Sequence, residues 1–167
     1  MLFIVAIVVT TSLPLLQKQI AIREIDFVAR RLIAHAHFAR GQALRLGESV
    51  MLAPRSNGQW GSGWNILSGC VENSTQTNCY PKIWLSHPKT DPIFFKGGAK
   101  SFVDPHHGGV GIVFNGAGAA RTAHGGFVAN RLILRHQRVL NLERQLILGS
   151  GGRWRICDPD QDARRCH

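Results

Sequence analysis

The sequence predicts an α+β fold in which one long N-terminal helix, hydrophobic in its first half, packs on a C-terminal antiparallel β-sheet head. Three observations lead to this prediction. The first residues are almost wholly apolar, a helical repeat of apolar residues continues as far as Leu46, and the rest of the chain alternates short apolar runs with glycine-rich turns. After the helix, roughly 120 residues remain, which is enough for one core of ordinary size.

The N-terminal segment is uncharged, but about fifteen apolar residues fall short of the roughly 20 that cross a bilayer core. A secretory signal peptide is one alternative, yet no basic stretch precedes the segment and no small-residue cleavage pattern follows it. Instead the helical pattern continues, because apolar residues recur every three or four positions and form one stripe. The stripe consists of Ile25, Val28, Leu32, Ala36, Ala39, Ala43 and Leu46.

Pro14 is expected to kink this helix rather than to end it. From Met1 to Leu46 the helix would extend about 70 Å, which is more than one small head covers. Its first half must therefore pack elsewhere, and only a bilayer or the helices of sister subunits can bury it. The residues expected in this membrane or filament contact are Leu2, Phe3, Ile4, Val5, Ile7, Val8, Val9 and Pro14.

Short apolar runs bounded by turn residues predict the strands of the head. The expected strands are Ser49–Ala53, Trp64–Leu67, Ile83–Leu85, Ile93–Phe95, Gly111–Phe114, Gly126–Leu134, Leu142–Leu148 and Arg153–Cys157. Pro54 is expected to stop the first strand. The expected turns are Ser56-Asn57-Gly58, Asn115-Gly116 and Ser150-Gly151-Gly152. The pattern does not specify how the strands pair.

The apolar start that ends at Pro14 resembles the later part of the N-terminal helix of type IV pilins. In that superfamily the mature helix begins with a sequence of the type Phe-Thr-Leu-Ile-Glu, behind a basic leader that a prepilin peptidase removes. Aligning Pro14 with the family's proline places Met1 several residues inside the mature helix. We therefore expect a translation start upstream of Met1, with a trimmed sequence as the alternative, and a prepilin peptidase as a partner in the first case.

The motifs that follow the helix resemble, in this order and over nearly the whole chain, the GspH/FimT family of minor pseudopilins. They are Gly63-Trp64-Asn65-Ile66, Gly111-Ile112-Val113-Phe114-Asn115-Gly116, Gly126-Phe127-Val128 and Gly152-Arg153-Trp154-Arg155. The resemblance implies a pilin-like fold, with residues 1–22 as a hydrophobic membrane or filament segment and residues 23–167 as a periplasmic head.

The same resemblance implies a subunit of a type IV pilus, or of the related type II secretion pseudopilus, in a Gram-negative bacterium. Such a subunit crosses the inner membrane once, with its head in the periplasm, and enters the pilus on assembly. The partners implied are other major and minor pilins and the inner-membrane pilus assembly platform.

The four cysteines form two pairs that are each nine positions apart, Cys70 with Cys79 and Cys157 with Cys166. Three connectivities are possible, and an oxidising periplasm favours the nearest-neighbour one. No Cys-x-x-Cys spacing occurs and the histidines are scattered, so we expect no metal site. No catalytic or dinucleotide-binding motif is present either, so neither a cofactor nor an enzymatic activity is expected.

The charge distribution is the second informative feature of the chain. The formal net charge is +10, and from Arg121 onward nine arginines and no lysine stand against four acidic residues. The planar guanidinium group of arginine binds phosphate oxygens bidentately, which lysine cannot do. The resemblance to FimT-type pilins of competence systems implies that the Gly-Arg-x-Arg hairpin near the C-terminus binds DNA.

In a strand, Arg153 and Arg155 project from one face about 7 Å apart, and Trp154 projects from the other. This separation is close to the roughly 6 to 7 Å between successive phosphates of a strand. Trp154 either packs into the core, which we favour, or stacks on a base. The residues expected to bind nucleic acid are Gly152, Arg153, Trp154, Arg155, Arg144, Arg164 and Arg165, with Arg135 and Arg138 extending the positive surface.

The alternative is that Arg153 and Arg155 are solvated or paired with nearby carboxylates, of which Asp158, Asp160 and Asp162 are candidates. Two functions of different class therefore remain. The first is a minor pilin that binds extracellular DNA for uptake in natural transformation. The second is a structural, GspH-like pseudopilin of a type II secretion system without a role in DNA binding.

Overall fold

The computed structural model of the chain describes residues 2–56, 58–69, 81–96, 111–121, 129–149 and 152–166, without the side chains of residues 2–14 and of Arg165. The expected bridge between Cys70 and Cys79 lies outside the described residues. So do the side chains of the expected membrane or filament residues, although the backbone of that segment is helical.

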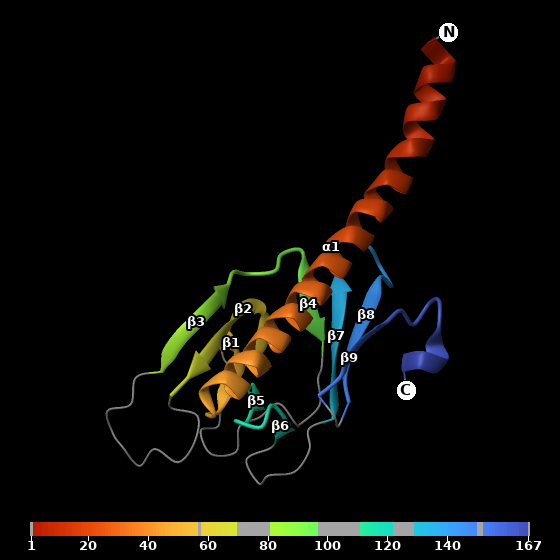
Figure 1. The fold of residues 1–167 in the computed structure, drawn as a ribbon. Coiled ribbons are helices and arrows are strands. Elements are labelled where there is room, and N and C mark those ends of the chain that lie inside the picture. Colours follow the sequence, from red (N-terminus) through yellow and green to blue (C-terminus); the bar gives the residue numbers. More distant parts are fainter. Residues whose placement is uncertain are drawn as a thin grey trace.

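The chain begins with the single helix α1, Leu2–Leu46, which continues through Pro14 as expected. Figure 1 shows that the helix crosses the head and then extends well beyond it toward the N-terminus, curving as it does so. It ends at Gly47, whose φ of 69° is the left-handed conformation that commonly closes helices. The Gly47 N–H donates to the carbonyl of Ala43 at 2.9 Å. In the described part of the chain, no helix is both long and apolar enough to cross a membrane.

The predicted apolar stripe of the helix is buried, with one exception. Its members from Ile25 to Ala43 are at most 8% exposed, but Leu46 is 38% exposed, so the prediction was wrong for this residue. At about 100° per residue, Leu46 lies at the edge of the stripe and in the last turn of the helix, where the least protein surrounds it. Ala21 and Ala29 belong to the buried face as well.

The strands form two antiparallel sheets behind the helix. The first sheet has the order β3-β2-β1-β5-β6 and consists of β1 Val50–Ser56, β2 Gln59–Ser68, β3 Lys82–His87, β5 Ile112–Phe114 and β6 Ala120–Arg121. The second has the order β4-β7-β8-β9 and consists of β4 Ile93–Lys96, β7 Asn130–His136, β8 Glu143–Leu148 and β9 Trp154–Cys157. The division into two sheets was not predicted.

Most strands lie where the sequence placed them, and the deviations have local causes. β1 continues through Pro54, which pairs with Trp64, because the register shifts between Pro54 and Ser56 and such irregularities tolerate a missing donor. β7 begins at Asn130, and the start of its expected range lies outside the described residues. The short strand β6 and the 3-10 helix η1, Ala163–Cys166, were not predicted.

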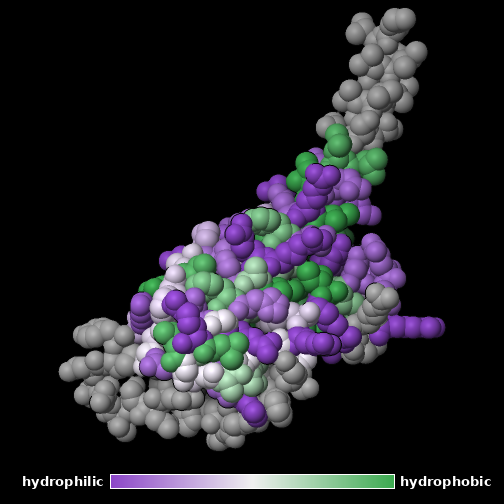
Figure 2. Space-filling model, viewed as in Figure 1, coloured by the Kyte–Doolittle hydropathy of each residue, from purple (hydrophilic) through white to green (hydrophobic). Residues whose placement is uncertain are grey.

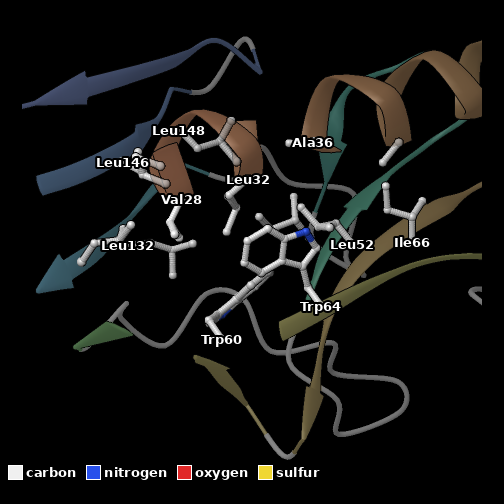
Figure 3. Packing of buried hydrophobic residues seen from close by; sticks show 14 of the residues in the cluster. Val28, Leu32, Ala36, Leu52, Trp60, Trp64, Ile66, Leu132, Leu146 and Leu148 are labelled. Carbon is white, nitrogen blue, oxygen red and sulfur yellow. The ribbon is translucent and has the colours of Figure 1, made fainter. Parts of the chain in front are cut away.

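One hydrophobic core joins the helix to both sheets. Figure 3 shows Val28, Leu32 and Ala36 of the helix between two groups of strand residues. On one side lie Leu132, Leu146 and Leu148 of the second sheet, and on the other lie Leu52, Trp60, Trp64 and Ile66 of the first. Because the helix supplies the surface on which both sheets pack, the sheets cannot shift without uncovering it.

A hydrogen bond attaches the helix to the first sheet. The indole Nε1–H of the buried Trp64 donates to Nδ1 of His35 at 2.8 Å. The ring of His87 stacks on Trp64, with ring centroids 4.1 Å apart and planes at 4°. Burial, and next the charges of His87 and Arg31, lower the pKa of His35. The neutral imidazole, whose Nδ1 accepts the hydrogen bond from the indole, is therefore the favoured form of His35.

Two polar side-chain contacts attach the helix to the second sheet. Nε2 of His136 lies 2.8 Å from a carboxylate oxygen of Glu24, and Nε of Arg144 lies 2.9 Å from a carboxylate oxygen of Asp26. Glu24 and Asp26 are the acidic residues of the helix, and the strand residues that meet them are almost fully buried. These contacts fix the rotation of the helix relative to β7 and β8.

Candidate nucleic-acid interface

The Gly-Arg-x-Arg motif forms the end of a tight hairpin between β8 and β9. Leu148 pairs with Trp154, and the Gly149 N–H donates to the carbonyl of Arg153 at 2.9 Å, which extends the ladder by one pair. The Gly152 N–H donates to the carbonyl of Gly149 at 2.9 Å and closes the turn. The expected turn is thus at its predicted place, although Ser150 and Gly151 lie outside the described residues.

Gly152 has a φ of 75°, a backbone conformation that glycine adopts readily and residues with a Cβ atom adopt only at a cost in free energy. This left-handed residue reverses the chain within a few positions, so that Arg153 follows directly at the edge of the sheet. The glycine of the motif is therefore required by the turn itself.

Arg153 and Arg155 are exposed and project from the same face of the hairpin, as predicted. Trp154 projects from the opposite face, is half-buried and packs against the core. This arrangement agrees with the inward interpretation of Trp154, in which the ring supports the hairpin rather than stacking on a base. The guanidinium groups are carried by a strand whose position the tryptophan helps to fix.

Arg144 is a correction to the predicted interface. It is 6% exposed, and its guanidinium donates to Asp26 at 2.9 Å, to Asp158 at 3.0 Å and to the carbonyl of Glu143 at 2.8 Å. The alternation of β8 places it on the face of Leu146, toward the helix. A buried cation needs partners of opposite charge, so Arg144 stabilises the head and does not belong to the exposed surface.

The carboxylates that could neutralise the motif are partly engaged elsewhere. Asp158 pairs with Arg144, and its second carboxylate oxygen accepts a hydrogen bond from the Asp160 N–H at 3.1 Å. No ion pair of Arg153 is found within the described ranges. The main alternative interpretation, a motif neutralised by its own tail, therefore lacks support at Arg153.

Arg131 is a candidate that the sequence analysis did not single out. In the register of the second sheet, Arg131 pairs with Ile147, which pairs with Arg155, so the two arginines lie on one face about 9.5 Å apart. Arg131 is exposed, whereas Arg135 on the same strand is bound to Glu143 at 2.7 Å. The alternation of β7 was a signal for Arg131, but only the pairing shows that it lies beside Arg155.

The C-terminal tail contacts β9, the edge strand of the second sheet. A disulfide joins Cys157 to Cys166 across a Cα–Cα distance of 5.5 Å, which confirms the expected local bridge. Nη1 of Arg131 donates to the carbonyl of Cys166 at 3.4 Å, so the side chain of Arg131 reaches the end of η1. Arg164, on η1, is exposed. The side chain of Arg165 lies outside the described residues.

Among the described residues, no group of three or more histidine, cysteine, aspartate or glutamate residues could hold a metal ion. The arrangement that remains is a group of three guanidinium side chains on one sheet face, those of Arg131, Arg153 and Arg155. Such groups can bind the phosphates of a nucleic-acid backbone, and contacts with phosphates carry no sequence information.

The chain resembles known proteins in both sequence and fold. Residues 28–167 match the family model described as GspH, Type II transport protein GspH. No curated protein sequence matches the chain. Among solved structures, the chain is similar to the type IV minor pilin FimU of Pseudomonas aeruginosa, with a TM-score of 0.56 and 17% identity over 87% of this chain and 96% of that one.

The chain is also similar to the minor pseudopilin EpsH from the type 2 secretion system of Vibrio cholerae. That match has a TM-score of 0.56 and 8% identity over 83% of this chain and 99% of EpsH. At these identities the likeness concerns the fold. It confirms the expected pilin-like α+β architecture of one long helix on antiparallel sheets.

Proposed function

Because the chain belongs to the GspH family of type II transport proteins, we propose that it is a FimT-like minor type IV pilin that takes part in pilus assembly and binds extracellular DNA for uptake in natural transformation. The DNA-binding element is the hairpin that carries Gly152, Arg153, Trp154 and Arg155. The proposal assigns no catalytic activity to the chain.

The observation that carries the DNA-binding part is the geometry of the hairpin. Arg153 and Arg155 are exposed on one face, and Trp154 anchors the same strand from the other. Arg131 adds charge beside Arg155. Contacts of this kind neutralise phosphates and release counterions, so binding is expected to be independent of sequence and to weaken steeply with salt.

The outward face of the helix supports the assembly part. Figure 2 shows hydrophobic side chains among hydrophilic ones on the viewed face of the helix. At about 100° per residue, four exposed apolar residues lie roughly 120 to 160° from the centre of the buried stripe. They are Leu16, Ile20, Phe27 and Phe38, which are 57%, 55%, 56% and 38% exposed. Neighbouring helices in a filament would remove this surface from water. Together with the apolar N-terminal segment, it favours other pilins as partners.

The localisation and the remaining partners follow from the same proposal. The N-terminal segment anchors the chain in the inner membrane, with the head in the periplasm, until the assembly platform transfers the subunit into the pilus. If the true N-terminus lies upstream of Met1, a prepilin peptidase processes it. The bridge between Cys157 and Cys166 suits an oxidising periplasm.

The test is a DNA-binding titration of the purified chain in detergent. The double variant Arg153→Ala/Arg155→Ala is expected to lose at least about tenfold in affinity, since two charge-assisted contacts are removed. The slope of log Kd against log salt is expected to fall by about 1.8 for duplex DNA. The matched control, Arg23→Gln/Arg30→Gln, removes the same charge from two exposed helix positions. Equal affinities of the two double variants would refute the DNA-binding role.

A structural pseudopilin of a type II secretion system is the second candidate, and the similarity to EpsH favours it. The two candidates differ in the phenotype of a strain that lacks the gene. Loss of DNA uptake with normal protein secretion supports the first. Loss of secretion with normal DNA uptake supports the second.

A further inference from the structure

The helix supplies a further cation to the hairpin turn, from a position 112 residues earlier in the chain. Arg40 lies on α1 and is partly exposed. A Cβ atom placed on Gly152 would lie 3.4 Å from Nη1 of Arg40 and 3.7 Å from its Cζ. The guanidinium of Arg40 therefore lies directly against the turn residue of the Gly-Arg-x-Arg motif.

This contact is not accounted for by neutralisation of charge. Within the described ranges, no ion pair or hydrogen bond of the Arg40 guanidinium is found. The acidic residues of the helix, Glu24 and Asp26, are engaged by His136 and Arg144. Arg40 thus brings a positive charge to a hairpin that is already basic, although mutual repulsion opposes that placement.

The placement has a geometric consequence for what can bind at the hairpin. Gly152 and Arg153 are consecutive, and consecutive Cα atoms are about 3.8 Å apart. Arg40 approaches Gly152 from the helix, whereas Arg153 and Arg155 project from the outer face of the sheet. Cations therefore lie on both sides of the turn. A group with several anionic oxygens is the ligand that lets both sides donate hydrogen bonds at once.

We propose that Arg40 is a further phosphate-binding residue, and that the backbone of a bound nucleic acid passes Gly152 with Arg40 on one side and Arg153 on the other. This inference rests on the proposed DNA-binding function and adds to it a residue and a path.

The experiment compares Arg40→Gln with Arg30→Gln in the full chain, using fluorescent single-stranded and duplex oligonucleotides at several salt concentrations. Arg30 is exposed on the same helix and about 15 Å farther from the hairpin along its axis. For Arg40→Gln, duplex affinity is expected to fall about three- to tenfold and the salt slope by about 0.9. For Arg30→Gln, both are expected to remain close to the parent values. Equal effects of the two substitutions overturn the inference.

A second measurement requires no substitution and so does not depend on the folding of a variant. In the parent chain, the Nε–Hε resonance of Arg40 is expected to shift on titration with the oligonucleotide, while that of Arg30 does not. An unshifted Arg40 resonance at saturation overturns the inference. If affinity still depends on Arg153 and Arg155, the proposed function stands without Arg40. If the parent chain binds no DNA, both the proposed function and the inference fail.

Discussion

Replacing Arg144 tests whether this arginine belongs to the fold or to the binding surface. The substitution Arg144→Met keeps most of the apolar stem and removes the guanidinium, which donates to Asp26 and Asp158 at 2.9 and 3.0 Å and to the carbonyl of Glu143 at 2.8 Å. Its loss leaves two carboxylates and a carbonyl oxygen without their donor.

The expected cost follows from the contacts. A hydrogen bond to a charged group contributes about 1.5 to 3 kcal/mol, and we take the lower value because the side chains of Asp26 and Asp158 are 32% and 18% exposed. The two carboxylate contacts together give a loss of about 3 kcal/mol in the free energy of unfolding. For a chain of this size, that loss lowers the Tm by about 6 to 12 °C.

The assay is urea and thermal unfolding of the chain in detergent, followed by tryptophan fluorescence, together with the DNA titration well below the Tm. The control is Arg135→Met, which breaks a pair with Glu143 in which Arg135 is 41% exposed. It is expected to cost less than about 1 kcal/mol. Arg144→Met is expected to lower stability and leave DNA affinity unchanged. A stability loss no larger than that of the control, or a loss of DNA affinity in the folded variant, would refute the assignment of Arg144.

Two further predictions concern the helix. Burial, and next nearby charge, lower the pKa of His35 in the folded chain, so the unfolded chain takes up the proton first. The free energy of unfolding is therefore expected to be highest above pH 6.5 and to fall as the pH drops from there toward the folded pKa. Urea titrations at pH 7.5 and 5.5 should show a smaller fall in this free energy for His35→Gln than for the parent chain. Phe27→Glu places a charge on the 56% exposed outward face, and is expected to leave the unfolding curve unchanged while excluding the subunit from pili, as measured by immunoblotting of sheared filaments. Normal incorporation of this variant would show that the face is not a filament contact.

The sequence could predict the elements whose signals are local. The apolar repeat from Ile25 to Ala43 predicted the buried face of the helix, because a helical period depends only on spacing along the chain. The short apolar runs predicted most strands, and the spacing of Cys157 and Cys166 predicted their bridge. In the candidate site, strand alternation predicted the opposite faces of Trp154 and its neighbouring arginines.

The features that could not be predicted from the sequence depend on pairing between distant segments. The count of arginines near the C-terminus could not separate Arg144 from Arg131, since both lie on strands and both carry the same charge. The register of β7, β8 and β9 turns Arg131 outward beside Arg155 and Arg144 inward toward Asp26. The division into two sheets escaped prediction for the same reason.

By itself, the sequence determined a long amphipathic helix, a β-rich head, a basic C-terminal hairpin and a disulfide, because each follows from residue types a few positions apart. The tertiary structure decided which charges are buried and which remain available. Packing of the helix on the second sheet uses Asp26 and Asp158 to neutralise Arg144, and it brings Arg40 against Gly152. A charged side chain can be buried only where an opposite charge lies next to it, because its desolvation is otherwise too costly. Which charges become neighbours depends on how distant segments pack in three dimensions.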